Sequence, residues 1–211
     1  MFNDRYGLTR AVLEGQKTMT RRVISKEKYP LLYSWQQNRL RFEILGNDTL
    51  RVWYKADPQS LRTVDHFDIR IPRQVGEVVA VAQSYREMGY NPRDTKQRSG
   101  EIWGLDHAAG WTNKMFVCAS ECKHQIRITN VRVERLQYIS EEDCLREGIV
   151  EYTCNLYEYR GICYSFEGDK TKMGTHKSPR EAFAGLIDKV SGKGTWASNP
   201  WVFVYEFELV K

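Results

Sequence analysis

The pattern of apolar and polar residues predicts a chain built mainly of β-strands. The clearest alternation lies in residues 125–136, where Ile126 and Ile128 are apolar and the residue between them is charged. A period of two residues is typical of a strand with one buried face. The apolar positions change parity before Val131, and this shift predicts a β-bulge or a tight bend near Asn130.

Seven further segments have the composition of strands, because they alternate in polarity or concentrate β-branched and aromatic residues. They are residues 18–24, 41–45, 49–54, 67–72, 78–82, 115–118 and 200–210. Residues 78–82 are apolar throughout, which predicts a buried central strand. Residues 41–45 and 49–54 flank Gly46-Asn47-Asp48 and predict a peripheral β-hairpin. Residues 200–210 have no polar face before Glu206, so we expect both faces of this strand to pack.

Short helices are predicted where capping residues precede apolar runs. Leu8–Glu14 is expected to be a helix that ends at Gly15 in a left-handed conformation. Ser140-Glu141-Glu142-Asp143 is typical of a capping box and predicts a second helix that ends at Gly148. Glu147 then lies in the last turn of this second helix.

A longer helix is predicted to begin at Ser178-Pro179-Arg180-Glu181, with Ser as the N-cap and Pro at the first helical position, and to run to about Val190. Residues 87–114 mix Gly, Pro, Asn and aromatic residues without periodicity, and we interpret them as a long loop or insertion. Many strands with a few short helices predict an α+β, mainly β, barrel-like fold.

Composition sets the broad class of the protein. A length of 211 residues fits one elaborated domain, and 41% apolar with 28% charged residues is ordinary for a globular protein. No window of eighteen apolar residues occurs, and Asp4, Arg5 and Arg10 interrupt the stretch where a signal peptide needs apolar residues. We therefore expect a cytoplasmic protein with no membrane partner. The net charge of +5 favours polyanionic partners only slightly.

The five cysteines are irregularly spaced, which favours free thiols over a disulfide framework. Cys118, Cys122 and His124, together with His176, carry atoms that bind soft metals, but their spacing matches no standard zinc module. We expect no metal and no other cofactor.

Several sequence blocks resemble those of the ASCH family. Gly15-Gln16-Lys17-Thr18-Met19-Thr20-Arg21-Arg22 is similar to the GxKxxTxR signature of that family, and Val75–Val81 resembles its "pGd" strand. Ile128–Gly148 resembles a strand followed by the "dis.eda..eG" helix. Gly194-Thr195-Trp196 and Asn199–Phe207 are similar to the closing segment of longer, phage-associated members.

The resemblance implies a fold. It implies a single PUA-like β-barrel over residues 1–211, related to modules that bind RNA, with short peripheral helices. Small deacetylating members are about half the length of this chain. The additional residues are expected to form insertions at about 26–68, 86–114 and 151–177.

The resemblance also implies an activity. Small bacterial members are amidohydrolases that remove the acetyl group from N4-acetylcytidine, using a Lys, a Thr and a Glu. Matched motif to motif, these fall on Lys17, Thr20 and Glu147. Amide hydrolysis without a metal needs a nucleophile, a base and a proton for the leaving amine. On this interpretation Thr20 attacks, Lys17 takes its proton, and Glu147 supplies or shuttles protons.

This chemistry places two conditions on the fold. The pKa of Lys17 must fall through burial or through a neighbouring cation such as Arg21 or Arg22. Residues three apart on a regular strand point to opposite faces, so Lys17 and Thr20 meet only if the turn after Gly15 is irregular.

A second set of residues is expected to contact the ligand. The candidates are Arg21, Arg22, Tyr85, Trp196 and Asn199. Longer relatives usually have an Arg-Glu-Thr-Trp-like block where this chain has Ala82-Gln83-Ser84-Tyr85, so Tyr85 is expected to supply an aromatic wall without the charge. The alternative interpretations are a solvated basic strand for the arginines and a core or rim position for Trp196.

Two functions remain open from the sequence. One is a metal-independent amidohydrolase acting on an acylated pyrimidine nucleoside or a related modified base. The other is a non-catalytic module that binds RNA or a modified nucleotide, and the aromatic and basic residues of 85–111 are either an RNA-contacting loop or a solvated one. Convergence of Lys17, Thr20 and Glu147 in a closed pocket favours the enzyme, whereas an open basic groove favours the binding module.

Overall fold

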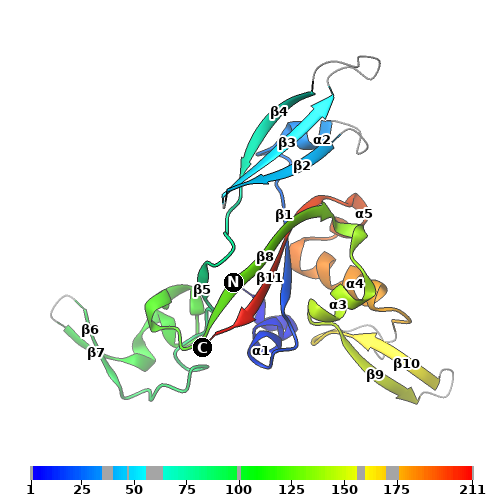
Figure 1. Cartoon of the computed structure of the whole chain (residues 1–211). Helices are drawn as coiled ribbons and strands as arrows, with labels where there is room; N and C mark the ends of the chain where they lie inside the picture. Colours follow the sequence, from blue (N-terminus) through cyan, green and yellow to red (C-terminus); the bar gives the residue numbers. More distant parts are fainter. Residues whose placement is uncertain are drawn as a thin grey trace.

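A four-stranded antiparallel sheet forms the centre of the computed structural model (Figure 1). The structure describes residues 2–34, 40–46, 48–55, 64–98, 101–155, 160–169 and 176–210, and for residues 55, 64, 95–98 and 101–103 it describes the backbone alone. The strands follow the order β1 (Met19–Val23), β11 (Trp201–Leu209), β8 (Gln125–Arg135) and β5 (Val78–Ala80). The sheet curls into half a barrel, so the fold is α+β and strand-rich.

The central strand of the sheet is β11, which pairs with β1 on one side and β8 on the other. Its first five residues are all buried. Phe203 and Tyr205 belong to one apolar cluster, and Val202 and Val204 belong to a second cluster on the other face of the strand. The prediction that both faces of this strand pack is confirmed.

The predicted bulge is also confirmed. Glu206 pairs with Asn130, whereas Phe207 pairs with Ile128, so Thr129 is an extra residue on β8. An extra residue bends a strand and increases its twist. The bulge therefore lies where the two longest strands of the curled sheet change register.

The strand predicted to be central proves to be an edge strand. β5 is three residues long and pairs only with β8 among the described strands. Val78 is exposed, while Val81, beyond the end of the strand, is fully buried. An apolar run indicates that some of its residues are buried. Both a central strand and an edge strand followed by a buried turn are consistent with such a run.

The segment 87–114, interpreted as a loop, contains ordered structure. β6 (Thr95–Arg98) and β7 (Glu101–Gly104) form a hairpin, and several single-turn 3-10 helices follow it. These turns are Leu105–His107, Ala109–Trp111, Lys114–Phe116 and Ala119–Glu121. The strand predicted at 115–118 is therefore wrong, because Asn113 caps a 3-10 turn in which Met115 and Phe116 are exposed.

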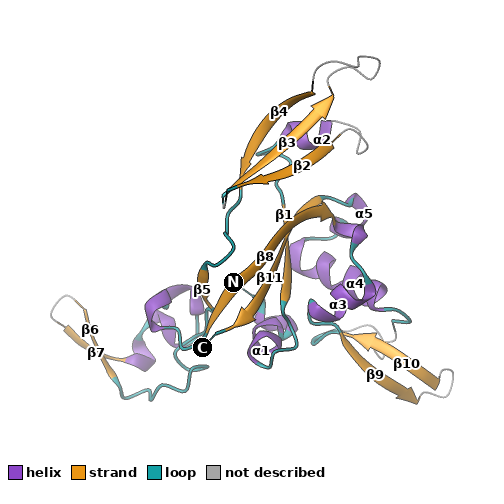
Figure 2. Ribbon diagram, viewed as in Figure 1, coloured by secondary structure: helices purple, strands orange, loops and turns teal. Residues whose placement is uncertain are grey.

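The helices are α1 (Leu8–Leu13), α2 (Pro30–Ser34), α3 (Glu141–Arg146), α4 (Pro179–Ser191) and α5 (Thr195–Ser198). The helices α3, α4 and α5 lie together beside the central sheet, whereas α2 lies with the strands β2 (Leu40–Leu45), β3 (Thr49–Lys55) and β4 (Val64–Arg70) (Figure 2). Ser140 and Ser178 cap α3 and α4 as predicted, each accepting a hydrogen bond from the backbone three residues later. Gly15 follows α1 with φ 74°, as predicted.

Three β-structures project from the central sheet (Figure 1). The first is a three-stranded arm of β2, β3 and β4. The second is the β6–β7 hairpin, and the third is the hairpin of β9 (Val150–Asn155) and β10 (Arg160–Ser165). The segments expected to be insertions thus form projections, although Asn47 of the predicted hairpin loop lies outside the described residues.

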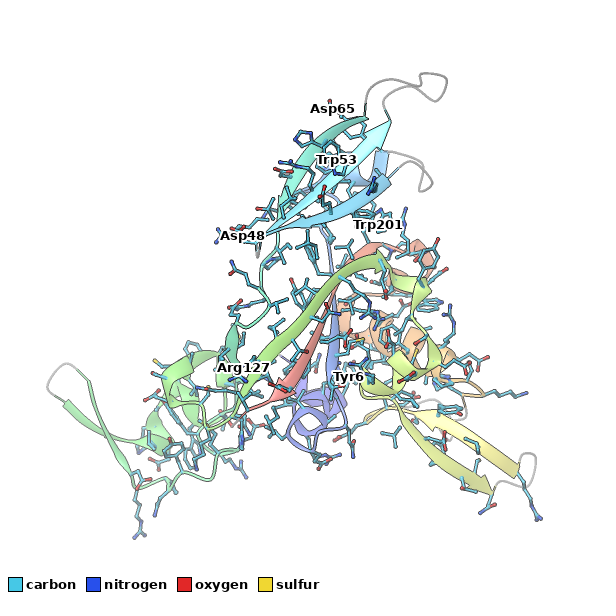
Figure 3. All side chains as sticks on the ribbon, viewed as in Figure 1. Tyr6, Asp48, Trp53, Asp65, Arg127 and Trp201 are labelled. Atoms are coloured by element: carbon cyan, nitrogen blue, oxygen red, sulfur yellow. The ribbon has the colours of Figure 1, made fainter. Side chains whose placement is uncertain are left out.

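The arm is attached to the central sheet through aromatic packing. The ring of Phe42 lies 4.6 Å from that of Trp201, measured between centroids, and Leu50, Val52 and Ile69 join the same apolar cluster. Figure 3 shows Trp201 at the end of the sheet that faces the arm. Among the described residues, no helix has the length and apolar character that crossing a membrane requires.

Candidate functional site

The start of β1 is fixed beside the end of α3 by backbone hydrogen bonds. The amide of Lys17 donates to the carbonyl of Ala11, and the amide of Thr18 donates to the carbonyl of Arg146. Gly15 reverses the chain between α1 and β1, so the polypeptide enters the sheet next to the C-terminus of α3. Since Glu147 is the C-cap of α3, this arrangement brings it next to Lys17.

Lys17 and Glu147 form a buried ion pair. The Lys17 Nζ lies 2.6 Å from Glu147 Oε2 and 2.8 Å from the Glu147 carbonyl oxygen. The two side chains are 2% and 5% exposed. Gly148, which follows Glu147, has φ 101°, a backbone conformation that favours glycine. The amine and the carboxylate are therefore held together out of contact with solvent.

Arg21 binds the second oxygen of the same carboxylate. Its Nη1 donates to Glu147 Oε1 at 3.1 Å, and its Nη2 lies 2.7 Å from Glu134 Oε1 and 2.9 Å from Asp143 Oδ2. The Arg21 side chain is fully buried. Glu147 thus shares its charge between an amine and a guanidinium.

The buried charges continue into a wider network. Arg132 binds Glu134 at 3.2 Å, Asp143 at 2.6 Å and Glu206 at 2.5 Å, and Arg146 binds Glu206 at 2.8 Å. With Lys17, Arg21 and Glu147, this gives four basic and four acidic side chains in mutual contact. Buried charges are tolerated when they are paired and hydrogen-bonded. The network therefore fixes the ends of β1, β8, β11 and α3 relative to one another.

The electrostatics of the site change the pKa of Lys17 and of Arg21 in opposite directions. Burial lowers the pKa of the Lys17 amine, the nearby Glu147 carboxylate partly opposes this, and the cations Arg22 and Arg21 lower the pKa further. For Arg21, burial also acts to lower the pKa, but Glu147, Glu134 and Asp143 outweigh it and raise the pKa above its ordinary value. Lys17 consequently gives up a proton more easily than a solvated lysine does, while Arg21 stays charged.

A cleft of about 880 Å³ adjoins the buried pair. Lys17, Thr20 and Glu147 all line it, so the structure brings the three predicted catalytic residues to one cavity. Thr20 is half-buried on β1, opposite Tyr205 of β11. Within the described part of the chain, no hydrogen bond joins the Thr20 hydroxyl to Lys17 or Glu147.

The remaining walls of the cleft differ in character. One wall is apolar and comes from α4, with Phe183, Leu186, Ile187 and Val190. Phe2 lines the cleft as well, and the Lys17 Nζ lies 6.0 Å from the centroid of its ring. The segments 2–5 and 22–27 also line the cleft and contribute exposed basic side chains. An apolar wall beside a few polar groups is usual for sites that bind small molecules.

Of the predicted ligand-contacting residues, Arg21 and Arg22 line the cleft and three others do not. Tyr85 is buried in a small separate cluster with Met88 and Leu105. Trp196 is half-buried and packs edge-on against Phe183, with the ring centroids 6.2 Å apart.

Asn199 connects two segments of the chain through hydrogen bonds. Its side chain accepts a hydrogen bond from the amide of Gln137, its backbone has φ 44°, and its carbonyl accepts from Arg135. The residue thus joins the end of α5 to the turn after β8. It holds the chain at the start of β11 and is not among the residues that line the cleft.

Sequence reasoning missed the acidic partners of Arg21. Asp143 lies one helical turn before Glu147, so both carboxylates share a face of α3. Glu134 comes from β8, which neighbours β11. The four-residue spacing of Asp143 and Glu147 on a predicted helix was the one sequence feature that indicated paired carboxylates. Nothing in the local sequence indicated which strand packs against that helix.

The cysteine and histidine residues considered for a metal do not converge. Cys118 is exposed, and the Cys122 thiol donates to the Cys118 carbonyl oxygen at 3.6 Å. His176 lies 2.9 Å from Asp169 instead. Across the described ranges, no three His, Cys, Asp or Glu side chains are grouped as a metal site requires.

The chain was compared with protein-family models, with curated proteins and with solved structures, and none of the three comparisons finds a match.

Proposed function

We propose that this chain is an ASCH-type protein with a PUA-like barrel, and that its cleft binds a nucleoside-like ligand and hydrolyses an acyl amide on it. N4-acetylcytidine is the reference substrate. The observation that carries the proposal is the buried contact between Lys17 and Glu147 at a cleft that Thr20 also lines. These are the three residues that the motif resemblance implies, and the half-barrel sheet is compatible with the fold it implies.

Lys17 suits the role of general base. A neutral lysine amine has two N–H bonds and one lone pair, and Glu147 offers two acceptors, its Oε2 and its carbonyl oxygen. With both N–H groups donated to Glu147, the lone pair is left to accept a proton. Arg21 favours the neutral amine, because its guanidinium also binds the Glu147 carboxylate and so weakens the interaction of that carboxylate with a charged Lys17.

The proposed reaction has two stages. In the first, the Thr20 hydroxyl oxygen attacks the acyl carbon, Lys17 accepts the hydroxyl proton, and the C–N bond breaks as that proton passes to the leaving amine. In the second, water attacks the threonyl ester and releases the carboxylic acid, with Lys17 and Glu147 again moving the proton. Catalytic hydrogen bonds often tighten only when substrate binds, so the absence of one to Thr20 is compatible with this role.

The dimensions and walls of the cleft support a ligand of nucleoside size. Pockets for small molecules commonly enclose about 300–1,000 Å³, and this cleft encloses about 880 Å³. A pyrimidine ring is flat and apolar on its faces, which suits the wall formed by Phe183, Leu186 and Ile187.

The test follows the conversion of N4-acetylcytidine to cytidine by chromatography. We expect turnover by the native chain and a loss of at least about 100-fold in Lys17→Met and in Thr20→Val. Lys193→Met, at an exposed lysine that is not among the residues lining the cleft, is the matched control and should retain activity. Binding of the nucleoside without turnover at high protein concentration would instead support the non-catalytic nucleotide-binding module.

A further inference from the structure

The cleft passes along one edge of β1. Thr20, Arg21, Arg22 and Val23 are consecutive residues of this strand, and all of them line the cleft. The side chains of a strand alternate between its two faces, so a cleft on one face is lined by every second residue. A lining of consecutive residues indicates that the cleft includes the edge of the strand. β11 pairs with the opposite edge, and Figure 1 shows α4 on the side of β1 away from β11.

The register of β1 on β11 determines which backbone groups face this edge. The Ile24 amide donates a hydrogen bond to the Trp201 carbonyl of β11. In an antiparallel pair the residues that exchange hydrogen bonds recur at every second position, so Thr20 and Arg22 also bond to β11. The N–H and C=O groups of Arg21 therefore point away from β11, toward the edge that the cleft follows.

Arg21 contributes its backbone to the cleft. The residue as a whole is 5% exposed, although its side chain is 0% exposed, so its accessible surface belongs to the main chain. In the part of the chain that the structure describes, no group accepts a hydrogen bond from the Arg21 amide. A nearly buried N–H costs free energy until an acceptor binds it. The Arg21 N–H is thus a donor for an acceptor within the cleft.

We propose that the backbone N–H of Arg21 is the oxyanion donor of the hydrolysis, and that it binds the oxygen of the acyl group. The inference rests on the proposed function, because it concerns the same reaction in the same cleft. The Arg21 nitrogen is joined to the Thr20 Cα through a single carbonyl carbon, so an acyl carbon beside the Thr20 hydroxyl brings its oxygen near this amide. The α/β-hydrolases likewise use the amide of the residue that follows their nucleophile.

The edge of β1 is also the place where the other groups meet. Thr20 lies on one face of the strand, whereas the Arg21 side chain extends from the opposite face to Glu147, which holds Lys17. An acyl group at the edge can therefore be reached from both faces. The bonds of the buried Arg21 guanidinium to Glu134 and Glu147 hold the backbone of this residue in place.

The amide acts without changing its own covalent bonds. When the Thr20 oxygen bonds to the acyl carbon, the π electrons of the C=O bond move to the acyl oxygen and Lys17 takes the hydroxyl proton. The Arg21 N–H then donates to this oxyanion. When the C–N bond breaks, the electron pair re-forms the C=O bond and the proton passes from Lys17 to the leaving amine. A donor fixed by the ladder of β1 and β11 stabilises the oxyanion without rearrangement.

The test replaces the Arg21 amide with an ester, which removes the N–H and keeps the side chain. A synthetic N-terminal segment that carries the ester is ligated to the expressed remainder of the chain. The reference is the all-amide chain ligated at the same junction. We expect the kcat for N4-acetylcytidine to fall about 100-fold in the Arg21 ester, with KM changed by less than about threefold.

The matched control is the same ester at Met19. The Met19 amide also points away from β11, because it lies two positions before Arg21, but Met19 is not among the residues that line the cleft. Each ester also weakens one carbonyl acceptor of the ladder. It is the Thr18 carbonyl in the control and the Thr20 carbonyl in the test. The Met19 ester should keep the kcat of the reference chain.

A second measurement does not depend on turnover. The probe is cytidine with a methylphosphonyl group on N4 in place of the acetyl group, because its tetrahedral, anionic phosphorus resembles the oxyanion intermediate. The Arg21 ester should bind this probe at least about tenfold more weakly than the reference chain does. The affinity of the Met19 ester for the probe should equal that of the reference.

Three results overturn the inference. Equal kcat in the Arg21 ester and the reference chain removes it, as does unchanged affinity for the phosphonyl probe. An Arg21 ester that fails to fold, beside a Met19 ester that folds, would show that the protein itself binds the Arg21 N–H. In each case hydrolysis of N4-acetylcytidine by the reference chain leaves the proposed function standing. If the reference chain does not hydrolyse N4-acetylcytidine, both fail.

Discussion

The Lys17 amine and the Glu147 carboxylate lie 130 residues apart in the sequence and meet at 2.6 Å in a position that solvent hardly reaches. Lys17 is placed by the turn between α1 and β1, and Glu147 is placed by the end of α3. Arg21 holds the second oxygen of the carboxylate. This contact joins two elements of the fold and is also the candidate catalytic centre, so its energetics can be tested independently of any ligand.

Glu147→Gln is expected to destabilise the protein by about 3 kcal/mol, because it leaves Lys17 and Arg21 buried without their shared carboxylate. The measurement is the free energy of unfolding in urea at pH 7. Glu142→Gln is the matched control, since the same change occurs at an exposed position of the same helix and should cost under about 0.5 kcal/mol. Equal, small losses in both variants would show that the pair contributes nothing.

Removing both partners is expected to cost less than the two single changes together. Lys17→Met with Glu147→Gln leaves neither a buried amine nor a buried carboxylate at this contact, so the unfolding free energy should exceed the additive value by about 1 kcal/mol or more. A double-mutant cycle in urea measures this coupling. Strict additivity would contradict a direct interaction between the two side chains.

The free energy of unfolding should depend on pH in the way that the lowered pKa of Lys17 predicts. Its pKa in the folded protein lies below the ordinary value of 10.5, mainly because of burial. Between these two values the unfolded chain binds a proton that the folded chain has lost, so the free energy of unfolding rises with pH. The contribution approaches about 1.4 kcal/mol per pH unit within that window.

Comparison with Lys17→Met isolates this contribution. The difference in unfolding free energy between the native chain and the variant should increase as pH rises toward 10.5, whereas Lys193→Met should show a constant difference. A Lys17→Met difference that stays flat with pH would mean that the buried amine keeps an ordinary pKa, and one that falls would mean that its pKa is raised.

Low pH should weaken the charge network at Glu206, because this carboxylate becomes protonated. The hydrogen bond from Arg146 lowers the pKa of this carboxyl below its ordinary value of 4.5, and Asn130 and Arg132 add to the effect. Its stabilising contribution is present above pH 4.5 and is lost as pH falls through the lowered pKa.

Glu206→Gln should therefore make the loss of unfolding free energy between pH 5 and pH 2 smaller than in the native chain. Glu208→Gln, two residues later on the same strand and half-exposed, is the control and should leave the acid profile unchanged. Identical acid profiles for all three proteins would show that Glu206 is not responsible.

Thiol reactivity should distinguish one cysteine from the other four. Cys118 is exposed, whereas Cys122, Cys144, Cys154 and Cys163 are buried. Burial raises the pKa of the Cys144 thiol to about 12, and the thiolate is the reactive form. We expect one rapidly titrating thiol in the native chain and five in urea.

Cys118→Ser should abolish the rapid reaction with a disulfide reagent and leave the total in urea at four. Mass spectrometry of the labelled native chain identifies the site directly. Rapid labelling of Cys154 or Cys163 would show that the β9–β10 hairpin opens in the native state.

Much of the local structure was predictable from the sequence. The alternation in 125–136 and its change of parity gave β8 and its bulge, and the caps at Ser140 and Ser178 gave the starts of α3 and α4. These features depend on residues within a few positions of one another, because strand period and helix capping are local properties of the chain.

The tertiary structure decided which strands and side chains are neighbours. The apolar run 78–82 does not distinguish an edge strand from a central one, because only neighbouring strands determine which it becomes. Tyr85 and Trp196 are aromatic residues that suit either a cleft or a core, and packing placed neither of them in the lining of the cleft.

For the candidate site, the sequence alone determined which residue types were present: an amine, a hydroxyl, a carboxylate and neighbouring arginines at motif spacing. It did not determine that Arg21 would be buried against Glu134, Asp143 and Glu147 while Arg22 stays exposed. Burial and the distance between charges depend on the packing of α3 against β1, and these two quantities set the pKa of Lys17.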